Sequence, residues 1–198
     1  MKDKFMKRLY DINTFRRFIG DAVKSFSDTR KARNNPDISK SFINRILLAV
    51  TQVNGCRYCT YLHTRNALEE GMSEDEVKGF LDGDLSEAPP EESVALLYAE
   101  HYADSEGKPD EESTARFFKT YGNEKGSQLL GIIHSIMVGN LHGNMIDALK
   151  HRLKRQAAEG STFGREIGIV FGIVLFVPEA AIRHLLTVRK HSNVMKHA

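Results

Sequence analysis

Two cysteines and one histidine lie close together in the sequence and carry its strongest chemical signal. Cys56 and Cys59 bound the segment Cys56-Arg57-Tyr58-Cys59, and His63 follows four residues after Cys59. Asn54-Gly55, just before them, is a strong break, so a new helix is predicted to start at Cys56. Residues three or four apart lie on one face of a helix, so both thiols and the imidazole are expected side by side.

This spacing points to thiol redox chemistry. Cys56 falls on the first turn of the helix, where unpaired backbone N–H groups and the helix dipole favour an anion. His63, one turn after Cys59, can accept the thiol proton or stabilise the thiolate. The thiolate would attack a peroxide or disulfide, and the second cysteine would resolve the sulfenic acid or mixed disulfide. The three residues therefore predict peroxide reduction or thiol–disulfide exchange.

Two other interpretations of the cysteines remain open. Cys56, Cys59 and His63 could form part of a zinc site, but the chain has no second cysteine pair and no obvious fourth ligand. The cysteines could also be buried apolar residues without chemistry. The redox interpretation is favoured, with no metal and no bound cofactor expected.

Composition sets broad limits on the class of protein. The chain has 198 residues, of which 41% are hydrophobic and 27% charged, as in an ordinary globular domain. Two cysteines cannot build the disulfide framework of a secreted domain. The N-terminal segment mixes charges of both signs and has no apolar stretch typical of a signal peptide. We therefore expect a cytoplasmic protein with one core domain.

The small net charge of +2 conceals an uneven distribution. Residues 1–45 hold 12 basic and 5 acidic residues, residues 46–125 hold 7 and 17, and residues 126–198 hold 9 and 4. Neither basic stretch shows a DNA-binding pattern, so nucleic acid is not an expected partner. The basic ends are predicted to be solvated or to contact the acidic middle of a neighbouring subunit.

Apolar residues recur at three- and four-residue spacing along most of the chain, which predicts an all-α fold. Asp11 or Asn13, Ser39 or Ser41, and the capping box that begins at Ser73 mark helix starts. A Pro-Asp pair before residue 111 starts a further helix, which Gly122 is expected to stop, and residues 126–151 form a longer one.

The last quarter of the chain has a different pattern. Gly164, Gly168 and Gly172 lie four apart, a spacing that lets another helix approach closely, within the subunit or at an oligomer interface. The apolar run 167–177 is shorter than the roughly 20 residues that span a membrane, so no span is predicted. A second helix is expected to begin at Pro178. The predicted organisation is an N-terminal helical arm, a core and a C-terminal helical extension, over residues 1–38, 39–155 and 156–198.

The segment from Val53 to Cys59, with His63 and the run from Ala67 to Met72, resembles the AhpD-like, carboxymuconolactone decarboxylase superfamily over roughly residues 40–150. The resemblance implies an AhpD-like helical bundle that assembles as a trimer or hexamer. It also implies an alkylhydroperoxidase that cycles between dithiol and disulfide and is re-reduced by an external thiol. By this resemblance Cys59 attacks the hydroperoxide or disulfide substrate and Cys56 resolves, whereas the helix dipole alone favours Cys56.

The sequence departs from the peroxidase pattern of this family at two positions. Asn44 stands twelve residues before Cys56, where the pattern has a glutamate that feeds a proton relay, and an amide cannot relay a proton as a carboxylate does. Tyr58 stands where the pattern often has histidine. These changes predict weakened peroxidase turnover. Decarboxylation is disfavoured because the decarboxylases of the superfamily typically lack the cysteine pair.

Some supporting roles and one other class of function are also open. Tyr58 and Asn44 are candidate supporting residues, and so are His134 and His142, which lie on the long helix expected to pack on the cysteine helix. Core or interface packing is the simpler role for these two histidines. A non-catalytic, oligomeric binding or stress-associated protein on the same scaffold is the alternative function, and Asn44 favours it.

Overall fold

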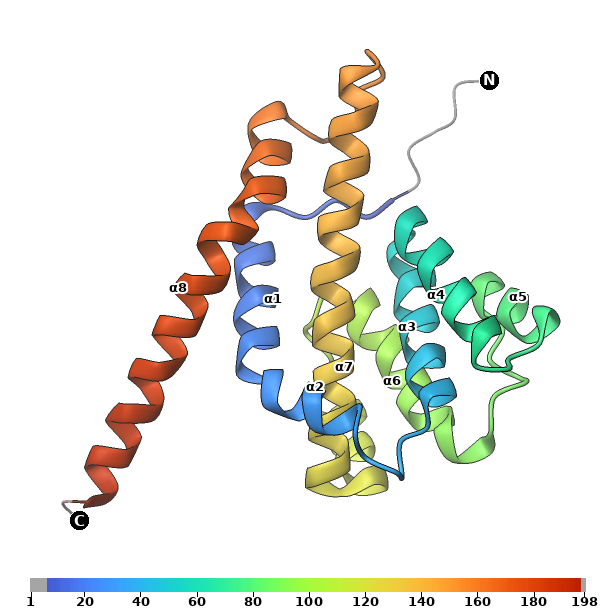
Figure 1. The fold of residues 1–198 in the computed structure, drawn as a ribbon, viewed down its shortest axis with the longest axis vertical. Coiled ribbons are helices and arrows are strands. Elements are labelled where there is room, and N and C mark those ends of the chain that lie inside the picture. Colours follow the sequence, from blue (N-terminus) through green and yellow to red (C-terminus); the bar gives the residue numbers. More distant parts are fainter. Residues whose placement is uncertain (1–6, 197–198) are drawn as a thin grey trace.

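A computed structural model shows a helical bundle around one long helix (Figure 1). The structure describes residues 7–196, and side chains up to residue 189; residues 1–6 of the predicted arm lie outside this range. Within it there is no strand, so the all-α prediction is confirmed. The helices are α1 (Ile12–Lys24), α2 (Phe26–Ala32), α3 (Lys40–Asn54), α4 (Arg57–Glu69), α5 (Glu74–Asp82), the short 3-10 helix η1 (Pro90–Glu92), α6 (Ser93–Asp104), α7 (Glu111–Leu153) and α8 (Phe163–Lys196).

Helix α7 is the scaffold on which the others pack. Helices α1, α2, α3, α4, α6 and α8 all contact it. The core consists of large side chains from several helices that are shielded from water, among them Phe15, Phe18, Ile46, Leu48, Leu96, Leu129, Ile133 and Met137. Two of these, Phe15 and Phe18, belong to α1, so the first helix contributes to the same core as the rest.

The predicted helix starts are confirmed by their caps. The side chains of Asp11, Ser39 and Ser73 accept hydrogen bonds from the backbone N–H groups three residues later, at 2.9, 3.0 and 3.0 Å. Each bond satisfies one of the donors that a helix start leaves unpaired. Gly122 adopts φ 70° and ψ 172°, which breaks the regular helix and kinks α7 where a stop was predicted.

The prediction that a new helix starts at Pro178 is wrong. Helix α8 runs through Pro178 without a break. A proline lacks the backbone N–H that would bond to the carbonyl oxygen four residues earlier, which here belongs to Val174. Val174 is 71% exposed, so water can satisfy this carbonyl oxygen instead.

By length and composition alone, α7 and α8 are both apolar enough to cross a membrane. The apolar segment of α7 is largely buried in the bundle, whereas only 11% of the corresponding segment of α8 is buried.

Only one of the three spaced glycines makes a close contact with another helix. A Cβ atom at Gly168 would lie 2.9 Å from Cδ1 of Ile12 on α1. A Cβ at Gly164 would meet nothing within 4 Å, and one at Gly172 would meet the ring of Phe176 on the same helix. The close approach predicted for this segment therefore occurs inside the chain, where α8 crosses α1.

We predict that Gly168→Leu lowers the melting temperature by about 3–10 °C, because overpacking this crossing costs about 1–3 kcal/mol. Gly164→Leu is the matched control, since its Cβ points into open space. Thermal unfolding followed by circular dichroism measures both variants. Equal melting temperatures for the two would show that the crossing is not tight.

Candidate functional site

The cysteine pair lies at the start of α4, as the break at residues 54–55 predicted. Cys56 is the N-cap of this helix, and its sulfur accepts a hydrogen bond from the backbone N–H of Cys59 at 3.3 Å. The Cα atoms of the two cysteines are 5.3 Å apart and their sulfurs form a disulfide. The first turn of α4 therefore holds the pair in the geometry that reversible oxidation requires.

The two sulfurs differ in their access to solvent. Cys56 is fully buried, with 0% of its surface exposed. Cys59 is half-buried and lines a pocket of about 570 Å³. A molecule that enters this pocket meets Cys59 and not Cys56.

The pocket surface is mainly apolar, although seven of its thirteen lining residues also carry polar groups. Its apolar lining comes from Leu47, Leu62, Ile136, Gly139, Gly143 and Ile146. Its polar lining comes from Arg33, Tyr58, Cys59, His63, Ser135, His142 and Lys150. Two lining residues are fixed cations and none is acidic, so the pocket suits a largely apolar molecule that carries an anionic group.

His63 shares the pocket with Cys59, as their spacing predicted. The imidazole is only 9% exposed, and its Nδ1 atom has no hydrogen-bond partner among the described residues. Burial, together with the positive charge of Arg33, lowers the pKa of His63 to about 4. At neutral pH the ring is therefore uncharged and can accept a proton.

Helix α7 passes so close to the disulfide that only glycine fits at the contact. A Cβ atom at Gly143 would lie 2.7 Å from the sulfur of Cys56 and 3.5 Å from that of Cys59. Gly139, one turn earlier, also lines the pocket, but a Cβ there would meet only the end of Ile136, at 4.0 Å. The backbone of α7 thus forms the wall behind the cysteine pair.

A buried carboxylate lies one helical turn beyond this wall. Asp147 has 0% of its surface exposed and forms ion pairs with Lys7 and with Arg57, the latter at 2.6 Å. The hydroxyl of Tyr58 donates to the same carboxylate at 3.2 Å and accepts from Lys150 at 3.1 Å. Asp147 thereby connects residue 7, the first turn of α4 and α7 beside the disulfide.

This network changes the acidity of Tyr58. Burial opposes ionisation, but hydrogen bonds from Lys150 and Arg57 outweigh it and hold the pKa of Tyr58 below its usual value. Tyr58 also lines the pocket, but the hydrogen of its hydroxyl is donated to Asp147. Sequence reasoning missed Asp147, whose only signal is that it is an acidic residue between apolar neighbours on the long helix.

The other supporting candidates do not reach the pocket. Asn44 is buried on α3 and is absent from the pocket lining. His134 also lies outside it: its Nδ1 is 3.0 Å from the Ser25 hydroxyl, and its ring packs against Tyr102. The histidine of α7 that lines the pocket is His142, whose Nε2 is 3.0 Å from the carbonyl oxygen of Val170.

The described residues contain no cluster of side chains suited to a metal ion. In the part of the chain that the structure describes, no group of three or more His, Cys, Asp or Glu side chains could hold a metal ion. The zinc interpretation of Cys56, Cys59 and His63 therefore has no geometric support among these residues.

Comparison with known proteins adds one finding. A family model described as the carboxymuconolactone decarboxylase family matches residues 20–101, a segment that contains Cys56, Cys59 and His63. The resemblance seen in the sequence is confirmed by this match. No curated protein and no solved structure matches the chain.

We predict that His63 makes the protein less stable in acid. The folded-state pKa of about 4 lies below the unfolded value of 6.5, so the unfolded chain binds more protons between these values. The contribution of His63 to the free energy of unfolding should be fully present above pH 6.5 and should fall by about 3 kcal/mol towards pH 4. Urea unfolding from pH 4 to 7 should show a smaller loss in His63→Gln than in the parent. An equal loss of stability in the parent and in His63→Gln would contradict the lowered pKa of His63.

We predict that Gly143→Ala destabilises the oxidised protein by about 1–3 kcal/mol, because the added methyl group would overlap the Cys56 sulfur. Reduction should lessen this loss, since a free thiol can rotate away. Gly139→Ala is the control on the same helix, and it should unfold at the parent temperature or slightly above. Calorimetry with and without reductant measures the melting temperatures of both variants and the parent. If Gly143→Ala were destabilised equally in both redox states, the predicted overlap with the disulfide would be contradicted.

Proposed function

We propose that this protein, whose residues 20–101 match the carboxymuconolactone decarboxylase family, is a thiol-dependent oxidoreductase of the AhpD-like, alkylhydroperoxidase type. It would reduce a hydroperoxide or disulfide through the Cys56/Cys59 pair. The observation that carries the proposal is the difference between the two sulfurs. Cys59 lines an apolar pocket together with a neutral His63, whereas Cys56 lies fully buried behind it.

The first step uses the reduced pair. His63 accepts the proton of the Cys59 thiol, and the thiolate attacks one oxygen of the hydroperoxide. A sulfur–oxygen bond forms, the oxygen–oxygen bond breaks, and the leaving alkoxide takes the proton back from His63 to become an alcohol. Cys59 is left as a sulfenic acid.

The second step closes the disulfide. The Cys56 sulfur attacks the Cys59 sulfur and displaces hydroxide, which leaves as water with the proton of the Cys56 thiol. The two thiols thus supply the two electrons that reduce the hydroperoxide. An external thiol reductant of the cytoplasm then restores the pair, and no bound cofactor takes part.

The position of Cys56 suits it to be the leaving sulfur when the pair is re-reduced. An incoming thiolate reaches Cys59 from the pocket and displaces Cys56 as a thiolate. The Cys56 sulfur accepts the N–H of Cys59 at the helix start, which stabilises that negative charge. The helix dipole, which alone favoured Cys56 as the low-pKa thiol, is then compatible with Cys59 as the attacking one.

The pocket also favours a class of substrate. Its mainly apolar lining suits an organic hydroperoxide or disulfide better than hydrogen peroxide, which gains nothing from apolar walls. Arg33 is exposed at this pocket and has no ion-pair partner among the described residues, so it is available to an anionic group of the substrate. We therefore propose an apolar substrate with an acidic group.

The proposal is tested by the two single cysteine variants and His63→Ala, assayed for consumption of cumene hydroperoxide with a dithiol reductant. Cys59→Ser should abolish consumption. Cys56→Ser, treated with hydroperoxide in the absence of reductant, should form one sulfenic acid per chain and no disulfide within the chain. His63→Ala should shift the alkylation of Cys59 to higher pH. Unchanged consumption in Cys59→Ser would overturn the proposal.

The alternative is a non-catalytic binding protein on the same scaffold, which the uncharged Asn44 favours. The same assay separates the two, because a binding protein would consume no hydroperoxide even when fully reduced.

We predict that Asn44→Glu increases the rate of hydroperoxide consumption about tenfold or more, by restoring the carboxylate of the family's relay. Nδ1 of His63 has no partner among the described residues, which is the state expected when that carboxylate is missing. Asn44→Gln is the matched control, since it has the same length as glutamate but cannot ionise. Equal rates for the two variants would exclude a relay at this position.

A further inference from the structure

The outward side of α8 is an apolar surface that the described part of the chain leaves uncovered. Its large side chains are between 59% and 71% exposed at Phe171, Val174, Leu175, Ile182, Leu185 and Leu186. We call these six residues the α8 stripe. Helix α8 lies outside the segment that matches the family model, so this surface is a feature of this chain beyond that segment.

The stripe lies opposite the face that α8 packs on the bundle. Ile169, Ile173, Phe176 and Ala180 recur every three or four residues and pack against the core. Phe171, Leu175, Ile182 and Leu185 also follow helical spacing but are displaced by half a turn, which places them on the far side of the helix. Both sides of α8 are therefore apolar, and among the described residues only one side is packed against other helices.

The size of the stripe is comparable to a dimer interface. With 59–71% of each residue exposed, the six residues together present on the order of several hundred Å², the scale of the roughly 800 Å² that each partner buries in a stable complex. A soluble monomer rarely leaves so much contiguous apolar surface uncovered. Covering it would contribute substantial hydrophobic stabilisation.

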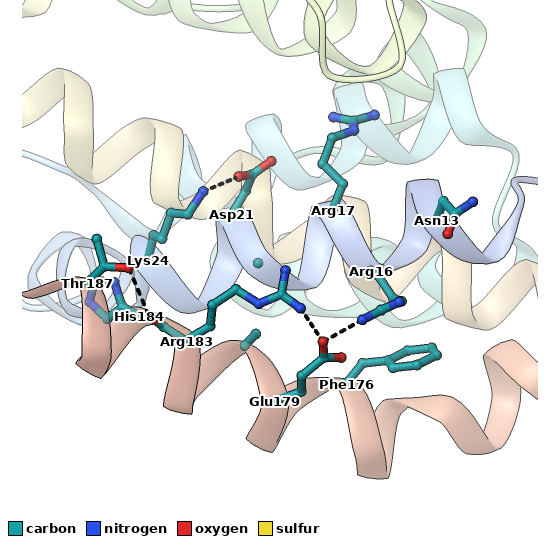
Figure 2. A pocket seen from close by; sticks show the side chains of 12 residues that line it. Asn13, Arg16, Arg17, Asp21, Lys24, Phe176, Glu179, Arg183, His184 and Thr187 are labelled. Carbon is teal, nitrogen blue, oxygen red and sulfur yellow. Dashed lines mark hydrogen bonds and ion pairs between the residues drawn. The ribbon is translucent and has the colours of Figure 1, made fainter.

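The surroundings of α8 argue against a membrane as its partner. A groove of about 650 Å³ separates α1 from the second half of α8 (Figure 2). In it Glu179 pairs with both Arg16 of α1 and Arg183, and Lys24 pairs with Asp21 at 3.2 Å. A membrane-spanning α8 would carry α1 and these charges into the hydrocarbon, which is costly.

We propose that the stripe binds the same stripe of a second copy of this chain, with the two α8 helices antiparallel. An apolar stripe is complementary to itself about a two-fold axis. Arg189 is exposed near the end of the stripe in the second half of the helix, whereas residues 167–178 are uncharged. Antiparallel pairing places each Arg189 beside the uncharged half of the partner, and parallel pairing would place the two arginines together.

Analytical ultracentrifugation of the full chain tests the pairing. The parent should sediment as a dimer or as a multiple of dimers. Leu175→Asp and Leu185→Asp should each halve that mass while keeping the parent circular dichroism spectrum. Leu97→Asp is the matched control, because Leu97 is 53% exposed but lies on α6, and it should sediment as the parent does. A monomeric parent, or α8 variants with the parent mass, would overturn the proposal.

Single cysteines test the orientation, with the native pair kept as its disulfide. In the antiparallel dimer a mixture of Phe171→Cys and Leu185→Cys should form cross-linked dimers. Phe171→Cys alone should not, since its two copies would lie about 21 Å apart. Self-linking by Phe171→Cys would overturn the antiparallel arrangement. Flotation of monomeric protein with phosphatidylcholine–phosphatidylglycerol vesicles, lost in Leu175→Asp, would identify a membrane as the partner instead.

Discussion

The contact between the first turn of α4 and the backbone of α7 at Gly143 determines how the candidate site is built. The disulfide of Cys56 and Cys59 lies against this point of α7, where a single methyl group would overlap a sulfur. Because α7 closes the inner side, Cys56 has no exposed surface and only Cys59 faces the pocket. The chemical distinction between the two thiols thus arises from helix packing and not from their sequence neighbours.

The same helix supplies the electrostatic setting. One turn beyond Gly143, the buried carboxylate of Asp147 binds Arg57 and Tyr58 from the start of α4 and also pairs with Lys7. A buried carboxylate is tolerated because two cations and a hydroxyl satisfy it. His63 is in the opposite situation: it is buried, near a cation and without a partner for Nδ1 among the described residues, and so it stays neutral. A neutral imidazole beside an accessible thiol can accept its proton, and its pKa of about 4 makes it a weaker base than one with a pKa near 7.

The sequence was sufficient for features that depend on local spacing. The positions of Cys56, Cys59 and His63 on one helix, and the caps at Asp11, Ser39 and Ser73, follow from three- and four-residue intervals and from side-chain hydrogen bonds to nearby backbone. The start predicted at Pro178 failed because a proline costs one hydrogen bond, and a long helix with an exposed turn can lose it.

Features that depend on how helices face one another were beyond the sequence. His134 and His142 are eight residues apart on α7, yet His142 lines the Cys59 pocket and His134 contacts Ser25. The role of Asp147 likewise requires residues from three distant parts of the chain. The domain boundaries at residues 38 and 155 remain predictions.

The proposed activity depends most on a dithiol that is oxidised by substrate through Cys59. The most direct test is the intact mass of fully reduced protein after addition of one equivalent of an organic hydroperoxide. We predict that the protein loses the mass of a hydrogen pair and that peptide mapping finds Cys56 linked to Cys59, with the corresponding alcohol released. A reduced protein of unchanged mass beside intact hydroperoxide would contradict it.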